Sequence, residues 1–148
     1  MIRPLSQRIL DTLEALDRQS ECWISVSRAN GSSHMIPVSY VWDGERIVLA
    51  TAENSVTVRS VNRSGRMRFS LPSTQDVVII DASAMVVPLQ KIDVTTHSLF
   101  RQTAGFDPER MKRPSVYILL TPERVHAWRT ERELPGREIM TAGIWRSD

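Results

Sequence analysis

Two residues near the C-terminus could together bind a planar aromatic ligand that gains negative charge on reduction. Trp128 closes the stretch Pro-Glu-Arg-Val-His-Ala-Trp at 122–128, and Arg137 follows nine residues later. An indole can shield one face of such a ring, and a guanidinium can stabilise charge that develops at its edge. The pair therefore indicates a site for a redox-active ring. Taken alone, Trp128 reads more readily as a half-buried aromatic of the last strand, and Arg137 as an exposed cation.

The elements that would position these residues are mostly short strands. Apolar and polar residues alternate over 22–26, and Asn30-Gly31 supplies a tight hairpin turn to a returning strand at 35–42. Further strands are predicted at 46–51, 66–71, 77–87, 115–120 and 124–129, with the last two joined at Thr121-Pro122. Six or seven strands with short connections predict a mainly β fold, an antiparallel barrel with flanking helices.

Three helices are expected beside the strands. The first, at 5–16, should cover an open end of the barrel with one apolar face. That face consists of Leu5, Ile9, Leu10, Leu13 and Leu16. A short helix at 55–62 would be capped by Asn54 or Ser55, and a third would span 93–105. The side chains of the third helix that face the core would be Val94, His97 and Phe100 or Leu99.

Pro37 interrupts the strand at 35–42. Apolar residues on both faces of this strand predict a central place in the sheet. A proline there lacks the N–H that a ladder hydrogen bond needs, so a bulge or a ligand would have to fill the position. The edge of a bound ring could lie there.

The order and spacing of several motifs resemble one known family. The motifs are His-Met-Ile-Pro-Val at 34–38, Trp-Asp-Gly at 42–44, Leu-Ala-Thr-Ala at 49–52 leading to Ser55, Pro-Glu-Arg at 122–124 with Trp128, and Arg137. Together they are similar to the pyridoxamine 5′-phosphate oxidase-like family of FMN-binding split β-barrels, which also includes enzymes using the deazaflavin analogue of FMN. The resemblance covers most of the chain. It implies a homodimer that binds FMN, or alternatively the deazaflavin, at the subunit interface.

The resemblance also implies a set of cofactor-binding residues. They are His34, Pro37, Val38, Thr51, Ser55, Thr57, Arg59, Trp128 and Arg137. The residues from His34 to Thr51 would lie at the ring, and Ser55, Thr57 and Arg59 would anchor the phosphate. Trp128 would cover the ring, and Arg137 would stabilise its charge. His34 fits equally well as a solvated residue at the start of a strand. No catalytic residue and no metal ligand is assigned.

Two departures from the family pattern limit this interpretation. The family's oxidases carry Ser-Arg-Lys where this chain has Ser-Val-Thr at 55–57, so two phosphate-binding cations are missing and only Arg59 is near. We therefore expect weak retention of FMN. The family's substrate-binding Arg-Leu-His-Asp-Arg segment reads Glu-Leu-Pro-Gly-Arg at 133–137. An anionic Glu133 in place of a cation predicts that pyridoxine 5′-phosphate is not the substrate.

Composition fits a single domain over residues 1–148. The chain is 41% hydrophobic and 24% charged, and it has neither a bilayer-length apolar run nor a signal-peptide core, so a cytoplasmic protein is expected. One cysteine, Cys22, excludes an internal disulfide, and three scattered histidines predict no metal site. A net charge of +2 demands no nucleic-acid partner. The basic run at 59–68 reads first as a solvated face, second as a nucleic-acid surface and third as a cofactor phosphate site.

These observations predict an FMN- or deazaflavin-dependent oxidoreductase that acts on an unidentified small molecule. Two alternatives stay open: a flavin-sequestering or sensor protein without turnover, and a barrel interaction module without a cofactor. The chain has no Gly-x-Gly-x-x-Gly, P-loop or Gly-x-Ser-x-Gly motif. Dinucleotide, nucleoside triphosphate and serine-hydrolase chemistry therefore lack their usual sequence signals.

Overall fold

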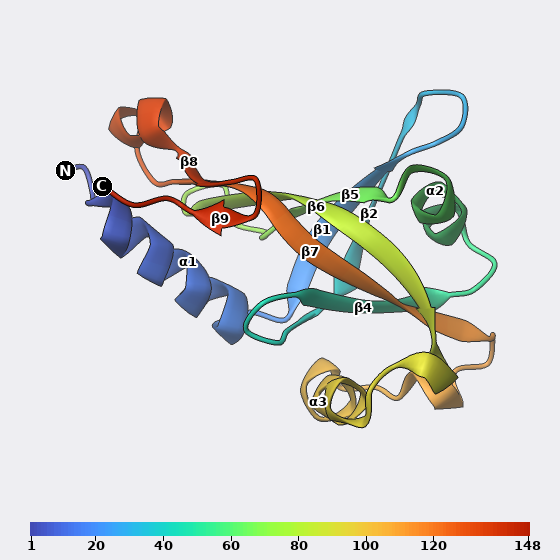
Figure 1. Cartoon of the computed structure of the whole chain (residues 1–148). Helices are drawn as coiled ribbons and strands as arrows, with labels where there is room; N and C mark the ends of the chain where they lie inside the picture. The colour runs from blue at the N-terminus through green and yellow to red at the C-terminus, as the bar shows by residue number, and fades with distance from the viewer.

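One antiparallel sheet, curled into a half-open barrel, organises residues 1–148 in this computed structural model (Figure 1). The strands of its main path run in the order β2-β1-β5-β6-β7-β4-β3. They span β1 Glu21–Ser27, β2 Ser33–Ser39, β3 Val41–Trp42, β4 Ile47–Ala52, β5 Arg66–Ser70, β6 Val77–Pro88 and β7 Ser115–Trp128. Two short strands, β8 Glu138–Thr141 and β9 Ile144–Trp145, extend the sheet beside β7. The predicted mainly β, antiparallel barrel is confirmed.

The main core fills the inside of the barrel. Ile24, Phe69 and Ile80 face one another across β1, β5 and β6, and each is at most 2% exposed. Tyr40, between β2 and β3, meets Phe69 edge to face with ring centroids 5.1 Å apart. Its hydroxyl donates to the carbonyl oxygen of Leu16 at 2.8 Å. This bond fastens the first helix to the barrel.

Three α-helices flank the sheet, none of them long and apolar enough to cross a membrane. They are α1 Leu5–Arg18, α2 Val56–Ser64 and α3 Val94–Ala104. α1 adds Ala15 and Leu16 to the barrel core, and α2 adds Val58 and Val61. The predicted burial of Leu10 is wrong, because this side chain is 61% exposed. At about 100° per residue, Leu10 lies about 120° around the helix from Leu16.

α3 covers the outer face of β4 and β7. Phe100 is fully buried and packs edge to face on Tyr117 of β7 and on Phe106, with centroids 5.3 Å apart in both pairs. The predicted helix is confirmed, but Val94 does not face the core, since it is 80% exposed. It is the first residue after the cap Asp93, and the buried residue of the first turn is Thr96 instead.

β7 is one long strand where the sequence predicted two. Asp81 of β6 lies opposite Arg124, but the next residue, Ala82, lies opposite Pro122. Glu123 is therefore the extra residue of a β-bulge. A bulge interrupts the ladder of hydrogen bonds locally, so it accommodates Pro122, which has no N–H to donate, without ending the strand.

β2 is an edge strand, so the predicted central position of Pro37 is wrong. β2 pairs only with β1, and the register passes through Pro37 opposite Trp23 without a bulge. Ile36 and Val38 pack against the barrel core, whereas Met35 and Pro37 are exposed on the outer face. Edge strands are where a sheet tolerates proline. The apolar residues on the second face of β2 therefore cover nothing within this chain.

Candidate functional site

The barrel is open between β2 and β4, because these two strands form no hydrogen-bonded ladder with each other; this opening is called the gap below. β3 pairs with β4 through Val41 opposite Val48. Continuing that register backward would place Val38 opposite Thr51, but β2 leaves β4 and pairs with β1 alone. The two strands stay close neighbours. The free edge of β2 carries backbone groups without a ladder partner, which can bond the edge of a planar ligand. The predicted ring residues Pro37, Val38 and Thr51 thus lie along one gap.

The end of β4 leads through a short turn to the N-terminus of α2. Ser55 has extended backbone angles, and its hydroxyl oxygen accepts the N–H of Val58 at 3.1 Å, which makes it the helix cap. The N–H groups of Val56 and Thr57 have no hydrogen-bond partner. Thr57 is only 1% exposed on the inner side of the helix, whereas Arg59 is exposed. Of the predicted phosphate anchors, Ser55 and Arg59 therefore face open space more directly than Thr57.

Three arginines gather between α2 and the β1–β2 hairpin. Arg28 follows β1, and Arg59 and Arg63 lie one turn apart on α2; together they line a cavity of about 260 Å³, here called the arginine cavity. Arg63 donates from Nη2 to the carbonyl oxygen of Ser27. Nη2 of Arg28 lies 3.0 Å from Nδ1 of His34. Of the predicted site residues, Arg59 therefore lines this cavity, and His34 contacts it only through Arg28.

The predicted cofactor-binding residues included neither Arg63 nor Arg28, although the basic run that contains Arg63 was considered as a phosphate site. Arg63 belongs to the basic run and follows Arg59 at a spacing of four residues, which places both on one face of a helix. That spacing was a usable signal. Arg28 lies 31 residues before Arg59 in the chain. Only the folding of the hairpin against α2 places it in the cavity.

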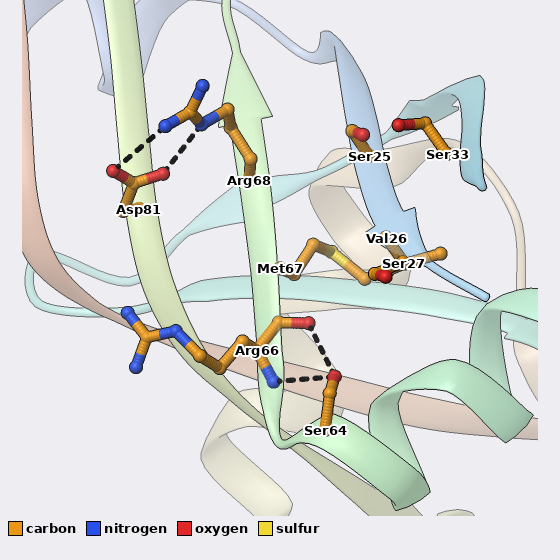
Figure 2. A pocket seen from close by; sticks show the side chains of 9 residues that line it. All are labelled: Ser25, Val26, Ser27, Ser33, Ser64, Arg66, Met67, Arg68 and Asp81. Atoms are coloured by element: carbon orange, nitrogen blue, oxygen red, sulfur yellow. Dashed lines mark hydrogen bonds and ion pairs between the residues drawn. The ribbon is translucent and has the colours of Figure 1, made fainter. Parts of the chain in front are cut away.

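Arg66 and Arg68, the rest of the basic run, lie on the outer face of β5 and already have partners. Arg66 pairs with Glu123 at 3.3 Å. Arg68 pairs with Asp81 at 2.7 Å, as Figure 2 shows. β1 and β5 separate beyond Ser25, which lies opposite Arg68, and a second cavity of about 480 Å³ opens there. Figure 2 shows the serines that line it: Ser25, Ser27, Ser33 and Ser64. Its cations are compensated, so this cavity is polar but nearly neutral.

Trp128 and Arg137 lie together at the other end of the sheet. The backbone N–H of Ala127 donates to the carbonyl oxygen of Arg137 at 2.9 Å, beside the half-buried Trp128. Arg137 itself is exposed, with Nη1 bonded to the carbonyl oxygen of Leu134 at 2.7 Å. Trp128 lies opposite Val77, six residues along β6 from Ser83, which pairs with Arg66 just after α2. That spacing corresponds to about 20 Å.

Glu133 lies inside the protein and does not face a ligand site. It is 2% exposed, and its carboxylate accepts hydrogen bonds from the backbone and guanidinium of Arg3 and from the N–H of Arg129. The hydrogen bonds from Arg3 lower the pKa of Glu133 to about 2, against the opposing effect of burial. Glu133 therefore does not repel a substrate, and this part of the sequence interpretation is corrected. The missing substrate cation remains as the argument against pyridoxine 5′-phosphate.

One cluster of possible metal ligands forms where the sequence predicted none. Ligand atoms of His97, Asp107 and Glu109 lie within 4.8 Å of one another. Nδ1 of His97 also lies 2.6 Å from the hydroxyl oxygen of Tyr117. Asp107, however, has guanidinium groups at 3.9 and 4.0 Å. Those two cations already balance its charge without a metal.

The sequence matches no family model and no curated protein. Solved structures do match. A putative pyridoxamine 5′-phosphate oxidase from Listeria innocua superimposes with a TM-score of 0.65 at 15% identity, covering 86% of this chain and all of that one. An F420 reductase gives a TM-score of 0.61 at 16% identity, covering 76% of this chain and 93% of that one. This chain has the pyridoxamine 5′-phosphate oxidase-like split-barrel fold.

Split barrels of this kind include proteins with other ligands. A heme binding protein from Mycobacterium smegmatis gives a TM-score of 0.70 at 16% identity, covering 97% of this chain and 60% of that one. At such identities the likeness establishes the split barrel alone. The resemblance that the sequence motifs indicated is therefore confirmed for the fold, and the ligand has to be argued from the residues.

Proposed function

We propose that this protein binds FMN, or alternatively its deazaflavin analogue, in the gap between β2 and β4 and passes hydride or electrons to a small molecule. The observation that carries the proposal is the continuity of this gap with the capped N-terminus of α2. A free strand edge suits the polar edge of a flavin ring, and a helix N-terminus suits its phosphate. The F420 reductase and the oxidase-like protein among the similar structures support a ligand of this class.

The proposed site is complete only in a homodimer. Within one chain, Trp128 lies about 20 Å along the sheet from Ser83, the residue of β6 that pairs with Arg66 just after α2. In a two-fold dimer, if one region of the first copy contacts a second region of the other copy, the reverse contact also forms. Two regions that are far apart within one chain can therefore lie together at two equivalent sites. Trp128 and Arg137 of one copy would then cover the ring that lies beside Pro37 and Val38 of the second copy.

The cofactor would supply the redox chemistry, and the protein would bind and orient it. Arg137 uses one guanidinium nitrogen on Leu134, which leaves its other N–H donors available to a ring edge. Its charge would stabilise the negative charge of the reduced ring. The segment 133–136 offers neither arginine nor histidine, so the substrate would differ from pyridoxine 5′-phosphate.

A side-by-side titration of FMN and the deazaflavin against the purified protein tests the proposal. We expect saturable binding of at least one of them. Arg137→Ala should weaken it by about tenfold to a hundredfold, as for a charge-assisted hydrogen bond, and should make reduction of the ring harder. Arg132→Ala is the control, since Arg132 is an exposed arginine of the same segment without an ion pair. Equal behaviour of the two variants would return Arg137 to the role of a surface cation.

The two alternatives have distinct outcomes. Binding without turnover, in the presence of a reductant and an electron acceptor, would identify a sequestering or sensor protein. A protein that binds neither FMN nor the deazaflavin would be a barrel interaction module, and the proposed function would then be wrong.

A further inference from the structure

We propose that the arginine cavity is a binding site for a phosphate monoester. For the phosphate of FMN this assignment rests on the proposed function, but the chemistry of the cavity does not. The sequence has Ser-Val-Thr at 55–57, so no cation directly follows Ser55. Arg28 and Arg63, which no part of the motif predicts, would supply the positive charge beside Arg59.

The three arginines carry positive charge that nothing in the protein compensates. No carboxylate lies within ion-pair distance of any of them, although Arg66 and Arg68, a few residues on, both have one. Their hydrogen bonds go to neutral groups: Asn54 Oδ1 for Arg59 at 3.4 Å, the ring of His34 for Arg28, and the carbonyl oxygen of Ser27 for Arg63. Like charges gathered in one cavity repel one another, and a bound anion reverses that repulsion.

The hydrogen bonds also hold the guanidinium groups in place. The bond from Arg63 to β1 ties α2 to the hairpin, and the contact with His34 holds the Arg28 side chain against β2. Guanidinium groups bind phosphate through paired, parallel N–H donors. Each arginine keeps further N–H donors beyond the one it uses, so several remain for the ligand.

The N-terminal end of α2 adds to the positive electrostatic potential of the arginine cavity. The cavity runs along the face of α2 that carries Val56, Arg59, Ser60 and Arg63, beginning in the first turn. The N–H groups of Val56 and Thr57 have no partner, and the N-terminal end of a helix carries partial positive charge. A volume of about 260 Å³ suits a phosphate group with part of its ester chain, but it is small for a whole flavin ring.

Titrations with FMN and riboflavin test the site, because riboflavin is the same flavin without a phosphate. Arg28→Ala and Arg63→Ala should each lower the affinity for FMN about tenfold or more and leave riboflavin unchanged. Arg132→Ala, outside the cavity, should change neither. Arg63→Ala also loses the bond to β1, so urea unfolding of each variant is measured in parallel. Arg28→Ala loses only a contact with His34 and keeps the test interpretable if Arg63→Ala unfolds.

A second arm uses inorganic phosphate and calorimetry at low salt. We expect phosphate to bind the cofactor-free protein and binding to be lost in Arg28→Ala. Displacement of phosphate by FMN would assign the cavity to the cofactor, and binding of phosphate to FMN-saturated protein would assign it to a separate phosphorylated ligand. Phosphate binding without any flavin binding would sink the proposed function and leave the anion site standing. No phosphate binding, or equal losses for FMN and riboflavin, would overturn the site.

Discussion

The carboxylate of Glu133 is 1% exposed and receives hydrogen bonds from both side chain and backbone of Arg3. Arg3 also contacts Asp11 at 3.0 Å, so the pair joins the N-terminal segment, α1 and the segment that precedes β8. Buried ion pairs cost much when one partner is removed, because the other charge remains without a counterion. Glu133 is therefore a structural residue, although the sequence placed it in the substrate site.

We predict that the Glu133 ion pair stabilises the protein only above acidic pH. Its pKa falls from 4.5 to about 2 on folding, so its contribution is complete above about pH 4.5 and is lost as the pH falls toward 2. The shift corresponds to about 3 kcal/mol. Urea unfolding at pH 7 and pH 3 should show that Glu133→Gln is destabilised at pH 7 and less pH-dependent than the parent.

Glu131→Gln is the control for this experiment, because Glu131 is exposed two residues away and has no ion pair. It should leave the free energy of unfolding unchanged at both pH values. A Glu133→Gln protein as stable as the parent at pH 7 would show that the ion pair contributes nothing net.

α2 is built from residues that form helices poorly. Val56, Thr57, Val58 and Val61 are β-branched, which lowers helix propensity. The helix depends instead on its ends and its packing: the Ser55 cap, a glycine at the C-terminal end with φ 67°, and two buried valines. Arg59 and Arg63 both lie on α2 and line the arginine cavity. The geometry of the proposed phosphate site therefore depends on the stability of this helix.

At the scale of this element, we predict that Ser55→Ala costs about 1 kcal/mol of unfolding free energy, through loss of the cap. Urea unfolding measures the change. Ser55→Asn is the matched control, since an asparagine caps nearly as well and should stay within a few tenths of a kcal/mol of the parent. If alanine and asparagine behave alike, the hydrogen bond that the Val58 N–H donates to the Ser55 hydroxyl oxygen does not stabilise the start of α2.

At the scale of the whole molecule, no helix covers the outer face of β2, β1, β5 and β6. Trp23 is 42% exposed and Met35 62% exposed on this face, and Ile79 lies in the same register row as Trp23. α3 covers only the part of the outer face around Tyr117. The same face also carries the Arg68–Asp81 ion pair, whose charges balance within the chain. The exposed apolar side chains beside that pair suit contact with a second copy of the chain, which the proposed site also requires.

We predict that the protein is a dimer in light scattering at micromolar concentration and that Trp23→Glu produces monomers. The variant should also lose flavin affinity, because each site would lack the Trp128 and Arg137 of the other copy. Val94→Glu is the control: Val94 is 80% exposed on α3, away from this face, and its variant should remain dimeric with normal affinity. A monomeric parent protein would remove the dimer and the shared site together.

The sequence by itself determined most of the strands, the start of α2 and the class of fold, because these depend on residues close in the chain. Alternation placed Ile24 inside the barrel, and Ser55 was one of the two residues predicted to cap α2. The fold class followed from many such short-range signals that agree with one another.

Only the tertiary structure decided which charged side chains lie together and which strand forms the edge of the sheet. Pro37 lies on an edge strand, Glu133 is buried on Arg3, and Arg28 reaches α2 across the hairpin. None of these follows from local spacing, since each depends on which distant segment packs against the residue. An arginine that meets a carboxylate across the sheet, such as Arg68, becomes structural. An arginine that meets no carboxylate, such as Arg59, keeps its charge available for a ligand.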